Sequence, residues 1–267
     1  MWLKLHKPIQ KVQEEPGLQG GYPPPIEDSV SKKYMEMGRE HRESRLGKVR
    51  SELVDKVGEE LVKQAEENVA AILANAKMQT RVPEAVVELI LQDRFKSLFE
   101  TTGKNNGAGA EQGRQYRAQT ENKAIGLPID MPLEYRPIYA SFNTPGASDE
   151  GAARYGNVKI TLKDRLRDRT TVSGDDNFYP GLTSSELNNF NVASLFKDGS
   201  DGISDITLKA LSQAKTTEEI RRILGSNYIE AQIHGTVTPE DIVAIEYIDG
   251  TEPSQYVKEW MRANLNG

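Results

Sequence analysis

Residues 228 to 234 combine polar groups that could take part in chemistry with a spacing typical of a strand. Glu230, Gln232 and His234 follow Tyr228 at every second position, with apolar residues between them. Successive side chains of a strand point to opposite faces, so a carboxylate, a carboxamide and an imidazole would share one face. An edge strand with one solvated face is the ordinary interpretation of such alternation. The pattern predicts either that edge strand or a row of polar groups that faces a cleft.

Two other segments contain residue types that bind anionic ligands. Arg136 lies at the start of one expected strand, and Arg169, Thr170 and Thr171 occur together in another. A guanidinium offers a planar fork of donors to phosphate oxygens and keeps its charge at any relevant pH. Each feature alone is ordinary, because strand arginines are usually surface cations and paired threonines are common in strands. Their order along the chain, arginine, threonine and then Glu230, is more specific.

Four ordered segments resemble the motifs of mono-ADP-ribosyltransferases, which split NAD and transfer its ADP-ribose. These segments are RFKSLFETTG (94–103), RPIYASF (136–142), RYGNVKITLKDRLRDRTTVSGDD (154–176) and YIEAQIHGTVTPEDIVAIEY (228–247). The resemblance is closest to the ADP-ribosyltransferase-like proteins found in phage head-morphogenesis chains and in related bacterial proteins, and it covers about residues 85–250. It implies an antiparallel split β-sandwich.

The resemblance also implies roles for individual residues. Arg136 would bind the NAD phosphates, and Thr170 and Thr171 would shape the nicotinamide pocket. Glu230 would be the catalytic carboxylate. The usual motif has Gln or Glu two residues before that carboxylate, whereas here Gln232 follows it; counted strictly, Gln232 would occupy the catalytic place. Glu230 is the preferred catalyst because a carboxylate, not an amide, carries the charge that stabilises a cation.

Several aromatic residues are weaker candidates for ligand binding. Tyr139, Tyr155, Phe178 and Tyr179 could stack on nicotinamide or adenine, although packing in the core is the more common use of an aromatic side chain. His234 could bond a ribose or cap the end of its strand. No metal site is expected.

The composition excludes several classes of protein. The chain of 267 residues has no cysteine and three histidines, which excludes disulfides and disfavours a multi-histidine metal site. A net charge of −6 argues against a globally basic surface, although a local basic groove stays possible. It contains neither a run of about 18 apolar residues nor a signal peptide, so no membrane role and a cytoplasmic location are expected.

Three regions are expected along the chain. Residues 1–46 are rich in proline, glycine and charge, and they predict an extended arm. Residues 47–132 form a helical region: one helix would run over 47–78 with a weak point at Gly58, and a second over 83–99, the two pairing as a hairpin. A Gly- and Asn-rich loop follows at 101–113. Residues 133–267 would form the ADP-ribosyltransferase-like domain.

The third region mixes strand and helix signals. Strands are expected at 135–142, 155–162, 169–172, 227–233 and 242–248. Helices are expected at 184–196, 216–224 and 254–264, the second with a capping box between Thr216 and Glu219. Because the elements do not alternate strictly, the fold class is α+β with antiparallel sheets.

The expected function is that of an NAD-dependent mono-ADP-ribosyltransferase with NAD as substrate and a protein or nucleic acid as acceptor. Such a protein would be a toxin or phage-related effector, and a cognate antitoxin or a capsid partner is possible. Two alternatives stay open. One is an NAD glycohydrolase, in which water replaces the acceptor, and the other is a non-catalytic adaptor that docks on a capsid or another partner.

Overall fold

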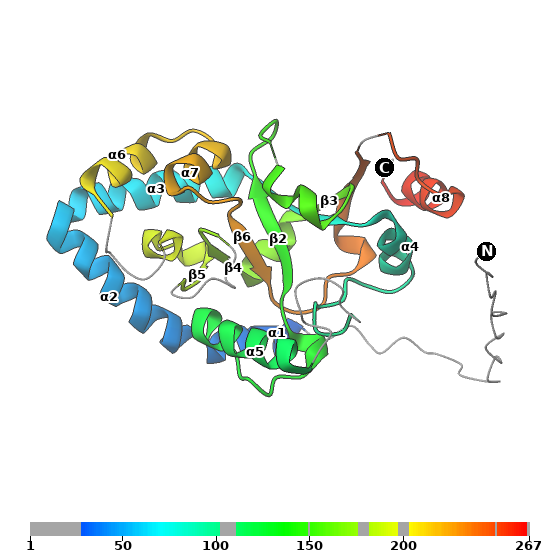
Figure 1. The fold of residues 1–267 in the computed structure, drawn as a ribbon, viewed down its shortest axis with the longest axis horizontal. Coiled ribbons are helices and arrows are strands. Elements are labelled where there is room, and N and C mark those ends of the chain that lie inside the picture. Colours follow the sequence, from blue (N-terminus) through cyan, green and yellow to red (C-terminus); the bar gives the residue numbers. More distant parts are fainter. Residues whose placement is uncertain are drawn as a thin grey trace, which may run out of the picture.

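A computed structural model describes residues 28–101, 111–148, 150–175, 182–196, 203–248 and 250–265. These residues fold as an α+β structure in which helices flank one antiparallel sheet (Figure 1). The helices are α1 (Asp28–Met37), α2 (Arg39–Val57), α3 (Glu59–Asn75), α4 (Glu84–Gln92), α5 (Glu111–Ile125), α6 (Asp205–Gln213), α7 (Thr217–Leu224) and α8 (Gln255–Asn264). The strands are β1 (Lys77–Val82), β2 (Ile138–Asn143), β3 (Val158–Leu162), β4 (Thr170–Ser173), β5 (Ser185–Glu186), β6 (Glu230–Ile233) and β7 (Ile242–Tyr247). The expected class, α+β with antiparallel strands, is confirmed.

The seven strands follow the order β5-β4-β6-β2-β1-β3-β7. Strand β6, which carries Glu230 and Gln232, therefore lies between β4 and β2 and pairs with both. The interpretation as an edge strand with a wet face is wrong, because both side chains are at most 4% exposed. Alternate side chains of β6 point to opposite faces of the sheet, and both faces are buried at this strand.

The register of the strands gives the sheet one polar and one apolar face. Residues directly opposite each other in an antiparallel pair lie on the same face. One row across the polar face consists of Glu186, Thr171, Gln232 and Tyr139, and the next of Ser173, Glu230, Ser141, Gln79 and Thr161. On the other face Val172, Ala231 and Ala140 align, and they belong to a core that also contains the buried residues of α3 and α4.

The N-terminal part of the described chain is helical. Residues 28–46, expected to be part of an extended arm, lie in α1 and α2; the prolines and most glycines of that arm precede them, in residues outside the described ranges. Gly58 ends α2 with a φ of +88°, so the predicted weak point breaks the helix. Helices α2 and α3 meet at this break and diverge from it in Figure 1, so the helix expected over 47–78, one arm of the predicted hairpin, is two helices.

Strand β1 lies within the region that was expected to contain helices and a loop but no strand. It pairs with β2 on one side and with β3 on the other, so the region 47–132 contributes an interior strand to the sheet. Ala76 and Met78 continue the helical spacing of α3, which hid the strand from the periodicity argument. Helix α4 begins after Pro83 as predicted, but it ends at Gln92 instead of Phe99.

Three expectations concern later segments. Residues 184–196 form β5 and two short 3-10 helices, not the predicted α-helix. Half of the predicted capping box of α7 is present, because the Thr216 hydroxyl accepts from the Glu219 N–H. The Glu219 carboxylate accepts from the backbone N–H of Lys215, one residue before the N-cap. The loop at 101–113 ends earlier than expected, at the start of α5, while residues 102–110 lie outside the described ranges.

Helix α2 fixes the position of α5. Arg42 Nη1 donates to the Ile125 carbonyl at 2.8 Å and His41 Nε2 to the Lys123 carbonyl at 2.9 Å, so α2 caps the C-terminal end of α5. At this crossing the backbones meet through two glycines. A Cβ on Gly126, whose φ is +81°, would lie 2.8 Å from the Cα of Gly38.

Candidate functional site

The candidate site is the polar face of β4, β6 and β2. Its central side chains come from two segments far apart in the chain, 170–175 and 230–234, which the strand pairing brings together, and Tyr139 and Ser141 of β2 lie beside them. Thr171, Ser173, Glu230 and Gln232 are all buried. Buried polar groups are stable only when they are hydrogen-bonded, so the contacts within this set decide its conformation.

Gln232 lies at the centre of these contacts. Its Oε1 accepts from the Thr171 hydroxyl at 2.9 Å. Its Nε2 donates to Glu230 Oε1 at 2.8 Å and to Ser173 Oγ at 3.0 Å. Both amide protons of Gln232 are therefore used within the protein. This side chain orients its neighbours, and it is not placed as a charged catalyst.

His234 extends the row beyond the end of β6. Its Nε2 lies 3.0 Å from the Thr171 hydroxyl. Its Nδ1 is buried and has no hydrogen-bond partner among the residues that the structure describes. Burial lowers the pKa of His234 to about 3, and the positive charges of Arg42 and Arg169 act in the same direction. The imidazole is therefore neutral at physiological pH.

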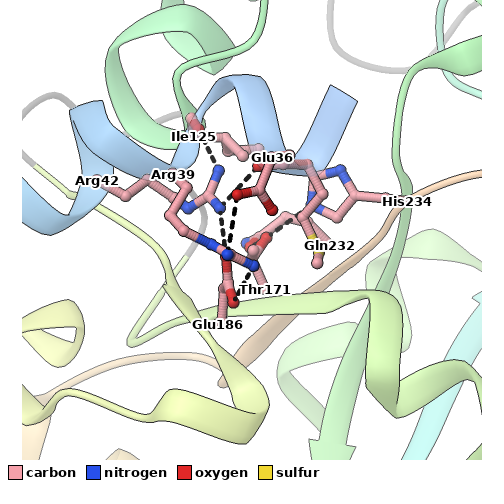
Figure 2. A network of polar contacts seen from close by, with 9 residues as sticks. Glu36, Arg39, Arg42, Ile125, Thr171, Glu186, Gln232 and His234 are labelled. Atoms are coloured by element: carbon pink, nitrogen blue, oxygen red, sulfur yellow. Dashed lines mark hydrogen bonds and ion pairs between the residues drawn. The ribbon is translucent and has the colours of Figure 1, made fainter. Parts of the chain in front are cut away.

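A cluster of two arginines and one carboxylate lies next to this row. Glu186, opposite Thr171 in the register, binds Arg42 Nη2 and Arg39 Nε, each at 2.9 Å. Figure 2 shows this cluster beside Thr171, Gln232 and His234. Burial lowers the pKa of Arg42, while Glu186 opposes that shift. Helix α2 thus brings positive charge to the polar face.

Arg136, the predicted phosphate anchor, is engaged inside the protein. Nη1 donates to Glu121 Oε2 at 2.7 Å, and Nη2 donates to the carbonyls of Pro128 and Ile129 at 3.2 and 2.6 Å. Its guanidinium carbon lies 4.4 Å from the ring centroid of Phe99, and the residue is 2% exposed. A phosphate could reach this guanidinium only by displacing some of these contacts.

Glu121 of α5 is a second buried carboxylate on the polar face. Besides Arg136, it accepts from the Tyr139 hydroxyl at 2.6 Å. Burial first, and then the charge of Glu121, raise the pKa of Tyr139 well above 10; Glu230 adds to this shift and Arg117 opposes it. Both carboxylates therefore oppose ionisation of the Tyr139 hydroxyl, which donates to Glu121.

The remaining candidates are not all close to Glu230. Thr170 lies on the apolar face opposite Ile233 and donates to the Leu166 carbonyl, because alternate strand positions face opposite ways; the two threonines cannot both line one pocket. Tyr155 bonds the Tyr228 hydroxyl at 2.8 Å. Phe178 and Tyr179 lie outside the described residues.

Five residues of these clusters were not predicted from the sequence: Arg39, Arg42, Glu121, Ser173 and Glu186. Arg42 and Glu121 occur in helices rich in charge, where a single buried charge has no distinct signal. Glu186 fell within a segment that was expected to be helical. Within the described residues, no group of three or more acidic or histidine side chains is arranged to hold a metal ion, and no helix is long and apolar enough to cross a membrane.

Comparison with known proteins finds distant relatives among phage proteins. No protein-family model matches the chain. It is 29% identical over 174 residues to the Gene 2 protein of Mycobacterium phage L5, an alignment that covers 62% of each protein. It is 27% identical over 209 residues to the Gene 2 protein of Mycobacterium phage D29, which covers 74% of this chain and 73% of that protein. The chain thus spans a little under two thirds of the L5 protein, and it is distantly similar to these two phage proteins.

Proposed function

We propose that the protein is an NAD-dependent mono-ADP-ribosyltransferase that acts in the cytoplasm on a protein or nucleic acid, as a phage-related effector or toxin. One observation carries the proposal. Glu230 and Gln232 from one motif of the resemblance and Thr171 from another are joined by hydrogen bonds on a single face of the sheet. The similarity to two phage proteins supports the phage relation. The split β-sandwich stays part of this proposal.

Glu230 would stabilise the positive charge that grows on the nicotinamide ribose as its bond to nicotinamide breaks. The transition state resembles that of glycoside hydrolysis, in which a carboxylate stabilises an oxocarbenium-like sugar. An opposite charge at about 4 Å contributes about 4 kcal/mol at an effective dielectric constant near 20. Because about 1.4 kcal/mol corresponds to tenfold in rate, the upper bound is on the order of a thousandfold.

In this proposal Arg136 positions Glu121 and Tyr139, and its contact with the NAD phosphates stays a prediction. Arg39 and Arg42 also lie beside the row and are held by Glu186, and the Arg117 guanidinium carbon lies 4.6 Å from the ring centroid of Tyr139. Tyr139 stays a candidate for contact with the ligand, because its ring belongs to the same row as Gln232. The antitoxin or capsid partner also belongs to the proposal.

A non-catalytic binding protein is the second candidate. It is favoured by the internal engagement of Arg136 and Gln232, whose hydrogen bonds are those expected of residues that stabilise a fold. NAD glycohydrolase activity would use the same row as the transferase.

Labelled NAD distinguishes these functions. The full chain is incubated with NAD labelled in its adenylate phosphate, with and without a bacterial lysate. Label on protein or nucleic acid supports transfer, free ADP-ribose supports hydrolysis, and intact NAD under both conditions rejects an enzyme.

A variant series ties any turnover to Glu230. Glu230→Gln is expected to lose at least 90% of the activity while NAD binding stays within a few fold. Glu240→Gln, the same substitution at an exposed position, is the matched control and is expected to keep full activity. Activity of Glu230→Gln above a tenth of the unaltered protein would contradict the catalytic role.

A further inference from the structure

The hydrogen bonds that connect His234 to Glu230 through Thr171 and Gln232 all run in the same direction. An ionised carboxylate only accepts hydrogen bonds, so the atom of Gln232 that faces Glu230 must be the amide nitrogen. The amide oxygen then faces Thr171, whose hydroxyl proton is used in donating to it. A hydroxyl has one proton, and the second contact of Thr171 must therefore be a bond that it accepts. Its donor is the Nε2–H of His234.

The surroundings of His234 determine which of its ring nitrogens carries the proton. A proton on Nδ1 would be buried without an acceptor among the described residues. On a ring already protonated at Nε2 it would also add a positive charge near Arg42 and Arg169. The missing acceptor disfavours the Nδ1–H tautomer, and both effects disfavour the doubly protonated ring, so the proton is on Nε2, where Thr171 accepts it.

We propose that Thr171 and His234 are positioning residues, which hold the Gln232 amide so that its N–H group donates to the Glu230 carboxylate. The hydrogen bonds run from His234 Nε2 to Thr171 Oγ1, from Thr171 Oγ1 to Gln232 Oε1, and from Gln232 Nε2 to Glu230 Oε1. A role of these hydrogen bonds in catalysis rests on the proposed function, whereas the geometry of the bonds does not.

This arrangement explains why Gln follows the carboxylate in this chain. A carboxamide can accept from Thr171 and donate to Glu230 at the same time, which a second carboxylate in its place could not do while ionised. Ser173 accepts the second amide proton and donates to the Asp175 carbonyl, so it secures the same orientation. Gln232 thereby holds one oxygen of Glu230 in place and favours its ionised form.

The test measures the titration of Glu230 in the full chain without any ligand. Protein labelled with ¹³C in its glutamate carboxyl groups is followed by NMR from pH 3 to 8, and the Glu230 signal is assigned by its loss in Glu230→Gln. Removing a donor from a carboxylate raises its pKa. Gln232→Leu is expected to raise the midpoint of Glu230 by roughly one unit. Thr171→Val and His234→Leu are expected to raise it in the same direction by a smaller amount.

Two matched variants separate positioning from general destabilisation. Thr171→Ser keeps the hydroxyl and is expected to restore the midpoint to within about 0.2 unit. Thr170→Val makes the same change as Thr171→Val at the neighbouring position on the apolar face, and it is expected to leave the midpoint of Glu230 unchanged. Unshifted titration in both Thr171→Val and His234→Leu, or in Gln232→Leu, would overturn the proposal.

The tautomer of His234 provides a second measurement, which needs no substitution at the row. Long-range ¹H–¹⁵N correlation at pH 7 is expected to show a protonated Nε2 and a bare Nδ1. The opposite tautomer would reverse the first bond and reject the proposal. Failure of the proposed function is recognised separately, by intact NAD in the labelling experiment together with these expected NMR results.

Discussion

Two buried carboxylates lie on the same face of the sheet, and they are held in different ways. Glu121 comes from a helix and forms an ion pair with Arg136, with a further bond from Tyr139. Glu230 comes from a strand, and the Gln232 amide that contacts it is neutral. An ion pair compensates the charge of its carboxylate, while an amide donor orients the oxygen that it contacts. The Arg136 pair thus fixes Glu121 between a helix and a strand, which suits a structural role, whereas the Gln232 amide fixes the direction of Glu230 Oε1 within the sheet.

Tyr139 connects the two carboxylates. Its hydroxyl donates to Glu121, and Glu230 contributes to the rise of its pKa. In the sheet it lies directly opposite Gln232, the residue that donates to Glu230. Tyr139 therefore lies between the carboxylate of α5 and that of β6. Substitutions in the cluster of each carboxylate test the roles of Glu121 and Glu230 separately.

Arg136→Leu is expected to produce the largest effect. It removes the nearer of two arginine partners of a fully buried carboxylate, since Arg136 Nη1 lies 2.7 Å and Arg117 Nε 3.7 Å from Glu121 oxygens, and this loss costs roughly 3 to 5 kcal/mol of the free energy of unfolding. Thermal and urea denaturation measure this loss. A phosphate anchor without a structural role would instead leave stability within about 0.5 kcal/mol and weaken NAD binding.

The double variant Arg136→Leu/Glu121→Leu controls for this effect. Replacing both members of a buried ion pair by apolar residues is often neutral, so the second substitution is expected to recover much of the loss. A double variant that is as unstable as the sum of both single variants would show that the two side chains do not act as a pair.

The second prediction concerns His234 at acid pH. Its pKa is lowered in the folded state to about 3, so the unfolded chain binds a proton near pH 6.5 while the folded chain does not. The stability that His234 contributes is therefore complete above about pH 6.5 and is lost as the pH falls toward 3, by at most about 1.4 kcal/mol per pH unit. Urea denaturation between pH 7 and 4 measures an expected loss of about 2 to 3 kcal/mol relative to His234→Gln.

The comparison with His234→Gln is needed because carboxylates also titrate in this range. Gln keeps a donor toward Thr171 and cannot be protonated, so its unfolding free energy is expected to fall less steeply with acid. His41→Gln is the matched control, since His41 is exposed on α2 and bonds the Lys123 carbonyl. Parallel curves for His234→Gln and the unaltered protein would contradict the depressed pKa.

The sequence predicted the strand that carries Glu230, but it did not indicate that Glu121 of α5 would be a buried carboxylate. Alternation along 228–234 placed Glu230 and Gln232 on one face, because strand geometry alone fixes that relation. It did not reveal that the face is buried, since burial depends on α5 and α2, which pack over it from elsewhere in the chain. Glu121 looks like any other charge of a polar helix until Arg136 and Tyr139 are placed against it.

A similar limit applied to the elements themselves. The strands at 155–162 and 242–248 and the cap at Thr216 follow from local patterns, and they were predicted correctly. Strand β1 was missed because its first residues continue the spacing of α3, so only its pairing with β2 and β3 identifies it. The segment 184–196 was mistaken for a helix because its serines and apolar residues fit a capped helix equally well.

Tyr139→Phe is expected to have the smallest effect and to locate the boundary between the two clusters. It removes one bond to the Glu121 carboxylate but leaves the Arg136 pair, so the loss in the free energy of unfolding is roughly 1 to 2 kcal/mol. Because the pKa of Tyr139 is raised in the folded state, its contribution is complete below about pH 10 and is lost as the pH rises further. Urea denaturation at pH 7 and pH 10.5 is expected to show a smaller difference between Tyr139→Phe and the unaltered protein at the higher pH. If Tyr139→Phe also shifts the NMR titration of Glu230 as strongly as Gln232→Leu does, the two carboxylates belong to one coupled cluster and the division between a structural and a functional acid is wrong.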